Sequence, residues 1–146
     1  MTYKKELDLN LCWLWSFVIR SRAGFRCELY GKDDRQCFGN LQAAHIVTRG
    51  VKGIKFELRN GRCLCAAHHR YYTNRVEFWA KIVSELWPDD WQYLTMKKWQ
   101  EPTMDIDKEA LFAELFLEAQ KYVGTFHEYR PRLENIGHWA AKEKTK

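Results

Sequence analysis

The sequence predicts a small α+β protein in which two short strands and a helix surround a metal ion, with helices before and after this core. Three observations predict it: the Cys-x-x-His spacing of Cys65 and His68, extended segments on both sides of a glycine-containing loop, and apolar residues at helical spacing elsewhere. The chain has 146 residues, which fits one domain, so we treat 1–146 as a single unit.

The charge of the chain favours an anionic partner. The net charge is +5, and the basic excess lies between Arg20 and Arg75, whereas 101–118 is acidic. Five cysteines do not make the even framework of a secreted disulfide protein, so we expect a reducing compartment. The apolar run from Leu11 to Ile19 is too short to span a bilayer and has no small-residue cleavage site. We therefore expect a core helix there, rather than a signal peptide, and no contact with a membrane.

Local signals predict the elements of the first half. The expected segments are a helix over 9–22, an extended piece over 25–30, a strand over 41–47, a basic loop over 49–53, a turn at Asn60-Gly61 and a short extended piece over 62–64. The helix should end at Ala23-Gly24, because glycine readily takes the left-handed conformation that closes a helix. We expect Cys12, within this helix, to be a core residue.

The second half is predicted to be helical. Expected helices cover 66–72, a segment that starts at Asn74, a segment that starts at Asp89, and 107–123. Asn74 has Glu77 three residues later, which is the spacing of a capping box. Asp89 and Gln92, after Pro88, have the same spacing and predict a second capping box. Gly124 should end the last helix, and 125–146 should be a frayed tail. The chain then divides into a core of 25–80, a helical extension of 81–124 and this tail.

Cysteine and histidine spacing predicts a structural zinc site. Tetrahedral zinc usually takes its four ligands as two closely spaced pairs. Cys65 and His68 form one such pair, whereas Cys27 has no partner at this spacing and needs a loop to bring Cys37 beside it. The preferred ligand set is Cys27, Cys37, Cys65 and His68, with Cys63 as the reserve. The alternative is that these are buried thiols without a metal.

A second group of polar residues suits the hydrolysis of a phosphodiester. This reaction needs an activated water, a cation and donors for the developing charge. His45 ends an extended segment before a loop, which would present its imidazole to solvent, and a histidine is largely neutral at physiological pH. His69 begins a helix beside the metal site and can coordinate a divalent ion. Asn60 can fix the turn or orient His45.

Residues 27–78 resemble an HNH endonuclease domain of the ββα-metal type. The matching elements are Cys27, Ala44-His45, Asn60-Gly61 and Cys65-Ala66-Ala67-His68-His69, and residues 73–79 with the helices after them are similar to small HNH proteins of bacteriophages and prophages. The resemblance implies a metal-dependent DNA endonuclease in the cytoplasm of a bacterium or an infected host cell. It implies a monomer or homodimer, with partners in phage packaging or recombination.

The resemblance also implies a role for each residue of the second group. His45 would be the general base, Asn60 would position it and contact the catalytic cation, and His69 would bind that cation, which is Mg²⁺ or another divalent ion. One such centre cuts one strand, so a monomer should nick DNA. We expect Arg49, Lys52, Lys55, Arg59 and Arg70 to meet phosphates without sequence choice. Trp79, Trp87, Trp91 and Trp99 should serve packing rather than base stacking.

Three departures from the family pattern matter. Ala44 stands where the family has Asp or His as a second ligand of the catalytic cation, so cation affinity without DNA should be low. His68 and Tyr30 stand where cysteines are typical of the family. Cys37 would supply the ligand that is missing at Tyr30. The departure at Ala44 favours an alternative function, a catalytically degenerate, zinc-stabilised module for nucleic-acid binding or assembly. A third reading, a helical interaction protein, predicts no bound zinc.

Overall fold

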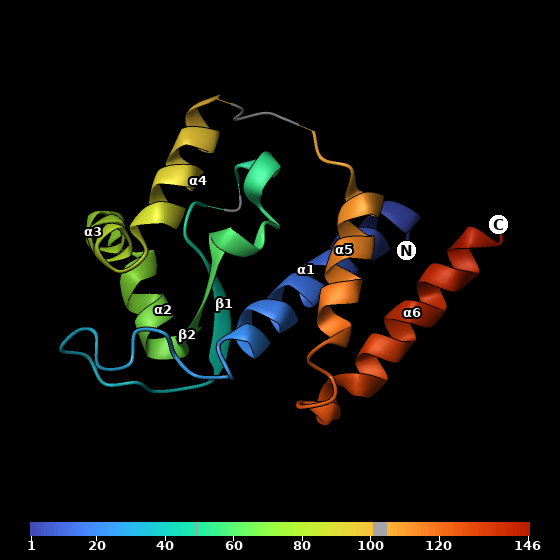
Figure 1. Ribbon diagram of the computed structural model, residues 1–146, viewed down its shortest axis with the longest axis horizontal. Coiled ribbons are helices and arrows are strands. Elements are labelled where there is room, and N and C mark those ends of the chain that lie inside the picture. The colour runs from blue at the N-terminus through green and yellow to red at the C-terminus, as the bar shows by residue number, and fades with distance from the viewer. Residues whose placement is uncertain (49, 101–104) are drawn as a thin grey trace.

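The computed structural model describes residues 1–48, 50–100 and 105–146. Within them the chain forms one two-stranded antiparallel sheet and six α-helices (Figure 1). The elements are α1 (Tyr3–Arg22), β1 (Leu41–His45), β2 (Gly61–Cys65), α2 (Ala66–Thr73), α3 (Val76–Leu86), α4 (Pro88–Gln100), α5 (Lys108–Gln120) and α6 (Arg130–Lys144), with short 3₁₀ turns at Lys52–Ile54, Leu58–Asn60 and His127–Tyr129. The predicted α+β class is confirmed at this level.

Helix α1 is longer than the sequence predicts, because Thr2 caps it. The Thr2 hydroxyl accepts a hydrogen bond from the backbone N–H of Lys5 at 3.3 Å. The helix ends where expected, with Gly24 at a φ of 68°. The prediction that Cys12 belongs to the core is wrong, since Cys12 is exposed on the outer side of the helix.

Strands β1 and β2 form a hairpin with a long connection. Leu41 pairs with Cys65 at one end and His45 with Gly61 at the other, so β1 stops two residues before the predicted end. Gly61 lies against α1, where an added Cβ would come within 2.5 Å of Ile19 and 2.6 Å of Trp15. Only glycine leaves room for this close approach of strand and helix. Residues 25–30, predicted to be extended, form turns instead.

Helices α2 to α4 follow the hairpin. The short helix α2 confirms the helix predicted over 66–72. The prediction of a capping box at Asn74 is wrong. Asn74 closes α2, and α3 begins after Arg75 without a side-chain cap. Helix α4 begins at Pro88 itself, where the missing N–H of proline costs nothing.

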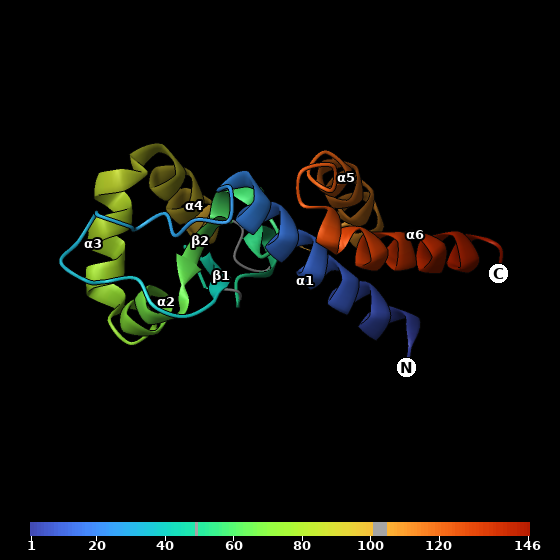
Figure 2. The same ribbon diagram turned by 90° about the horizontal axis from the view of Figure 1, so that it is seen from below.

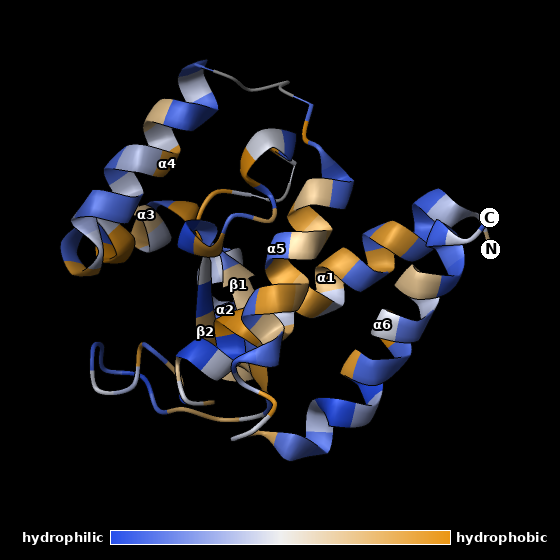
Figure 3. Ribbon diagram, turned by 45° about the vertical axis from the view of Figure 1, so that its right-hand side comes forward, coloured by the Kyte–Doolittle hydropathy of each residue, from blue (hydrophilic) through white to orange (hydrophobic). Residues whose placement is uncertain are grey.

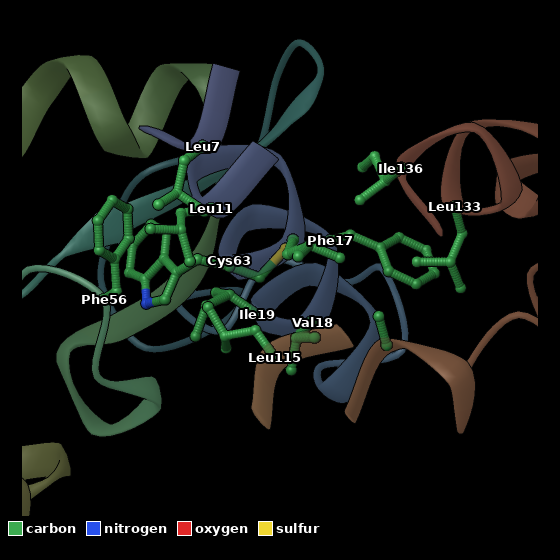
Figure 4. Packing of buried hydrophobic residues seen from close by; sticks show 13 residues of the cluster. Leu7, Leu11, Phe17, Val18, Ile19, Phe56, Cys63, Leu115, Leu133 and Ile136 are labelled. Atoms are coloured by element: carbon green, nitrogen blue, oxygen red, sulfur yellow. The ribbon is translucent and has the colours of Figure 1, made fainter. Parts of the chain in front are cut away.

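Two groups of helices lie on either side of the hairpin and the C-terminal half of α1 (Figure 2). One hydrophobic cluster joins α1, β2, α5 and α6, and Figure 4 shows Phe17, Cys63, Leu115 and Leu133 within it. Two smaller clusters join the hairpin to α2, α3 and α4. Helices α1 and α5 pack together in the first cluster. Both carry stretches of hydrophobic residues (Figure 3).

The C-terminal segment is not a frayed tail. Residues 130–144 form α6, which buries Leu133 and Ile136 in the main cluster. Trp139 of this helix stacks on Tyr3 with 5.7 Å between ring centroids, and its indole N–H donates to Glu6 at 3.1 Å. Both ends of the chain are therefore tied together. No helix in the described part of the chain has the length and apolar character needed to cross a membrane.

Candidate metal centre and hydrolytic site

The four predicted zinc ligands come together at the start of α2. Their ligand atoms, the three Sγ of Cys27, Cys37 and Cys65 and a ring nitrogen of His68, all lie within 4.8 Å of one another. His68 Nδ1 is 3.6 Å from the sulfurs of Cys27 and Cys37 and 3.1 Å from that of Cys65. A tetrahedral zinc with bonds of about 2.3 Å to sulfur and about 2.0 Å to nitrogen separates its ligand atoms by roughly 3.5–3.8 Å. The group therefore has the composition and spacing to hold a metal ion such as structural zinc.

The pKa values of the cysteine thiols also favour the binding of a cation at this group. Burial and the neighbouring thiols of Cys27 and Cys65 raise the pKa of Cys37 to about 12, because crowded sulfurs resist ionisation when nothing neutralises them. Cys65 behaves differently. Burial opposes its ionisation, but hydrogen bonds from the backbone N–H and the ring of His68 outweigh that and lower its pKa to about 6. One thiolate is thus preformed, and a cation would favour the others.

The chain holds the four ligands in place from both sides. Cys65 caps α2, accepting from the backbone N–H of His68 at 3.4 Å. The loop that carries Cys37 lies on the start of the same helix, because Phe38 and Asn40 accept from the N–H groups of Ala67 and Ala66. Gly39 makes this possible: its φ is 86°, and an added Cβ would lie 2.8 Å from Ala66.

A residue that sequence reasoning missed, Asp33, lies directly behind His68. Its carboxylate is 2.9 Å from His68 Nε2 and accepts from the Tyr72 hydroxyl at 2.7 Å. Asp33 accepts the Nε2–H of His68, so a metal ion would replace only the proton that Nδ1 shares with Cys65, on the nitrogen that faces the three sulfurs. Hydrogen bonds from Tyr72 and His68 lower the pKa of Asp33 although burial opposes the shift. No sequence signal marked this residue, because it lies 35 positions from its partner.

The reserve ligand Cys63 lies elsewhere. It is fully buried in the main cluster with α1, and burial raises the pKa of its thiol to about 12. Cys63 is therefore a core residue, as its neutral thiol suits an apolar environment.

His45 is held rigidly at the end of β1, and it is half-buried rather than presented openly to solvent. Its ring stacks on Trp15 with 4.2 Å between centroids and an angle of 13°. Its Nε2 lies 2.9 Å from the carbonyl oxygen of Lys55, so Nε2 carries the proton. In the neutral ring the lone pair is then on Nδ1, which is the form that can accept a proton.

Asn60 is a brace for the loop between the strands. It is fully buried, and its amide donates to the carbonyls of Val47 and Ile54, both at 3.0 Å. Its side-chain oxygen accepts from the backbone N–H of Val47 at 2.7 Å. The expectation that Asn60 fixes the turn agrees with these contacts, whereas the expectation that it contacts a catalytic cation does not, because the oxygen is buried and engaged.

His69 lies in the first turn of α2 beside a small pocket. Its Nδ1 is 2.7 Å from the side-chain oxygen of Gln42, which leaves the lone pair on Nε2. Burial lowers the pKa of His69, which favours the neutral ring that binds a cation. The pocket measures about 240 Å³ and is also lined by Arg70, Thr73 and Asn74.

His45 and His69 lie on opposite faces of β1. His45 packs on α1, while Gln42, three residues earlier and thus of opposite parity along the strand, contacts His69 on α2. Ala44 also faces α2 and is buried in a cluster with Leu64 and Tyr72. The methyl group of Ala44 offers no ligand at the position where the resembled family has one.

The predicted phosphate contacts separate into distinct groups. Lys52 and Arg70 are exposed, and Lys55 is half-buried with its ammonium 4.9 Å from the ring centroid of Phe56. Arg59 is already paired with Asp90 at 2.6 Å and lies over Tyr93 at 4.0 Å. Arg49 lies outside the described residues. Of the tryptophans, Trp79, Trp87 and Trp91 pack as predicted, but Trp99 is 83% exposed.

Comparisons with protein-family models, with curated proteins and with solved structures gave no match to this chain.

Proposed function

We propose that this protein is a metal-dependent DNA endonuclease of the HNH type, which hydrolyses phosphodiester bonds and nicks one strand per active site. The observation that carries the proposal is the state of His45. The Lys55 carbonyl and the Trp15 ring fix its orientation and its tautomer, with the lone pair on Nδ1. A rigid imidazole in this tautomer is what a general base for water requires.

The tautomer of the second histidine and its lowered pKa support a role in the same reaction. In an in-line displacement the attacking water and the leaving oxygen lie on opposite sides of phosphorus. In the proposed reaction His45 would activate the water, and a cation on His69 Nε2 would stabilise the leaving oxygen. Because Ala44 supplies no ligand, water and the phosphate itself would complete the coordination of a Mg²⁺-class ion. Arg70, which lines the same pocket, favours an anion beside that ion.

Substitution of His45 tests the proposal. We expect His45→Ala to reduce the nicking of supercoiled plasmid about 10²- to 10⁴-fold in Mg²⁺ or Mn²⁺, since this is the usual contribution of a general base. DNA affinity and zinc content should stay at the wild-type level. His45→Gln, which keeps most of the volume against Trp15, should be equally inactive. The exposed His127, in the 3₁₀ turn before α6, provides the matched control, His127→Ala, which should nick normally.

Unchanged nicking by His45→Ala would remove His45 from the mechanism. Loss of zinc together with nicking in both His45 variants would instead assign His45 a structural role against Trp15.

One observation favours a second candidate, a zinc-stabilised module that binds nucleic acid without cutting it. Ala44 is 2% exposed and packs with Leu64 and Tyr72, so position 44 offers no ligand for a cation on His69. This candidate predicts DNA binding with no nicking in any divalent cation. Nicking that a chelator abolishes, and that an excess of Mg²⁺ restores, would exclude it.

A further inference from the structure

An open groove of about 800 Å³ lies beside the metal centre, on the segment between α1 and β1. Cys27, Cys37 and Cys65 are among the residues that line it. A single metal ion would occupy only a small part of this volume, since a groove of several hundred Å³ is typical of a site for an organic ligand. The rest of the groove is lined by aromatic and basic side chains that the proposed hydrolytic centre does not use.

Two aromatic rings stand at this groove with most of their surface in solvent. Tyr30 is 77% exposed and Phe38 is 81% exposed, and the two lie on either side of Cys37 in the same segment of chain. Exposed rings of this size contribute nothing to a core. Their backbone is nevertheless held, because Tyr30 N–H donates to Cys27 at 3.1 Å and the Phe38 carbonyl accepts from Ala67 at 3.0 Å.

The charge of the groove complements an anion. Arg26 and Lys32 line it and are exposed. The one acidic residue of the lining, Glu28, is half-buried, and its carboxylate accepts from the backbone N–H of Cys63 at 2.7 Å. The groove thus combines rings that can stack with cations that can meet phosphates.

We propose that this groove binds unpaired nucleotides of DNA, with bases stacked on Tyr30 and Phe38 and phosphates on Arg26 and Lys32. Aromatic side chains bind a base by its face, and in duplex DNA that face is covered by the neighbouring base pairs. The groove therefore selects DNA with a single-stranded stretch, such as a flap, a gap or a displaced strand. This inference depends on the proposed function only for the choice of DNA as partner, and it names the class of substrate.

Binding measured without cleavage tests the groove by itself. The zinc-loaded protein, with no added Mg²⁺, is titrated into a labelled 12-nucleotide single strand and into a duplex of the same sequence, and fluorescence anisotropy is recorded. We expect Tyr30→Ala/Phe38→Ala to weaken single-strand binding at least about fivefold, as the loss of a stacked base does, and to change duplex binding less than twofold. Tyr30→Phe keeps the ring and should bind like the wild type.

Trp99→Ala is the matched control, because Trp99 is an exposed ring on α4, away from the groove, and it should leave single-strand affinity unchanged. Zinc content and helicity are measured for each variant. Single-strand affinity that is unchanged in the double variant, or that falls equally in Trp99→Ala, would overturn the proposal. So would a wild-type protein that does not bind the single strand.

The failure of the groove and the failure of catalysis are distinguishable. If the protein binds the single strand through these rings but nicks no DNA, the proposed groove stands and the proposed endonuclease activity is wrong. If the protein nicks DNA through His45 but substitution of Tyr30 and Phe38 does not change binding, the proposed catalysis stands and the proposed groove is wrong.

Discussion

One carboxylate, that of Asp33, connects the metal centre to its surroundings. It contacts His68 and Tyr72 of α2, and it also accepts from the backbone N–H of Arg35 at 3.0 Å. A histidine that binds a metal needs its other ring nitrogen held by an acceptor, since this fixes the orientation of the ring and its tautomer. Asp33 is therefore a positioning residue for His68 rather than a ligand.

Removal of this acceptor should loosen the metal. We expect Asp33→Ala to weaken zinc binding about 10- to 100-fold, which is the usual cost of losing such a partner. Competition with a chromophoric chelator measures the affinity. Asp33→Asn, which keeps an acceptor oxygen, should have an intermediate effect, and Asp34→Ala, a change of the exposed neighbouring residue, should have none. Equal zinc affinity in Asp33→Ala and the wild type would show that His68 needs no such support.

At the scale of residues, local spacing predicted the ligands but not their supports. Cys65 and His68 share one helical turn, so their pairing follows from sequence distance alone. The brace of Asn60 and the contact of Asp33 join residues across loops, and nothing in the sequence records how those loops close. The opposite faces of His45 and His69 likewise became clear only once the parity of β1 was known.

At the scale of elements, ion pairs of Asp90 connect α4 to β2 and to the 3₁₀ turn before it. It pairs with Arg59 and with Arg62, and Arg62 is 5% exposed and lies over Trp87 at 4.6 Å. Burial opposes the ionisation of Asp90, but the hydrogen bonds from the two arginines outweigh it and hold its pKa below the usual value. The folded state is therefore stabilised by the charged form of this side chain.

The pH dependence of the free energy of unfolding tests the contribution of these ion pairs. We expect Asp90→Asn to lose about 1–3 kcal/mol at pH 7, because Arg62 is left buried without its charged partner. A lowered folded pKa contributes stability that is complete above the unfolded value, about 3.9, and disappears as pH falls through the folded value. The difference between wild type and Asp90→Asn in urea unfolding should thus shrink below about pH 4. Asp89→Asn is the control, and a difference that persists at low pH would assign the loss to packing.

Elements with a periodic apolar face were predictable, whereas those defined by packing were not. Helices α2 and α5 lie close to their predicted limits, and Asp107 caps α5 by accepting from Ala110. Helix α6 was missed because its polar sequence buries only two residues, Leu133 and Ile136, and its place depends on α1 and α5. The capping box at Asn74 failed because the end of α2 already uses that residue.

At the scale of the whole molecule, a metal bound to the four ligands would stabilise the two halves to different degrees. The main cluster joins α1, α5 and α6 through large apolar side chains and needs no ion. The segment between α1 and β1 has few backbone hydrogen bonds to the rest of the chain, among them that from Glu28 N–H to Cys63, and it holds two of the four ligands. A bound metal would therefore contribute most to the arrangement of this segment and of the start of α2, where the other two ligands lie.

Removal of the metal should therefore unfold the molecule unevenly. We expect one zinc per chain, and after chelation we expect amide hydrogen exchange to accelerate by orders of magnitude in 25–40 and in α2, while α1 and α5 keep most of their protection. The reason is that binding energy at a structural zinc site is folding energy for the segments that supply its ligands, and segments packed in a separate cluster lose none of it. Exchange measured by mass spectrometry with and without zinc distinguishes the cases. Uniform acceleration would show a single cooperative unit, and unchanged exchange would show that the four ligands hold no structural metal.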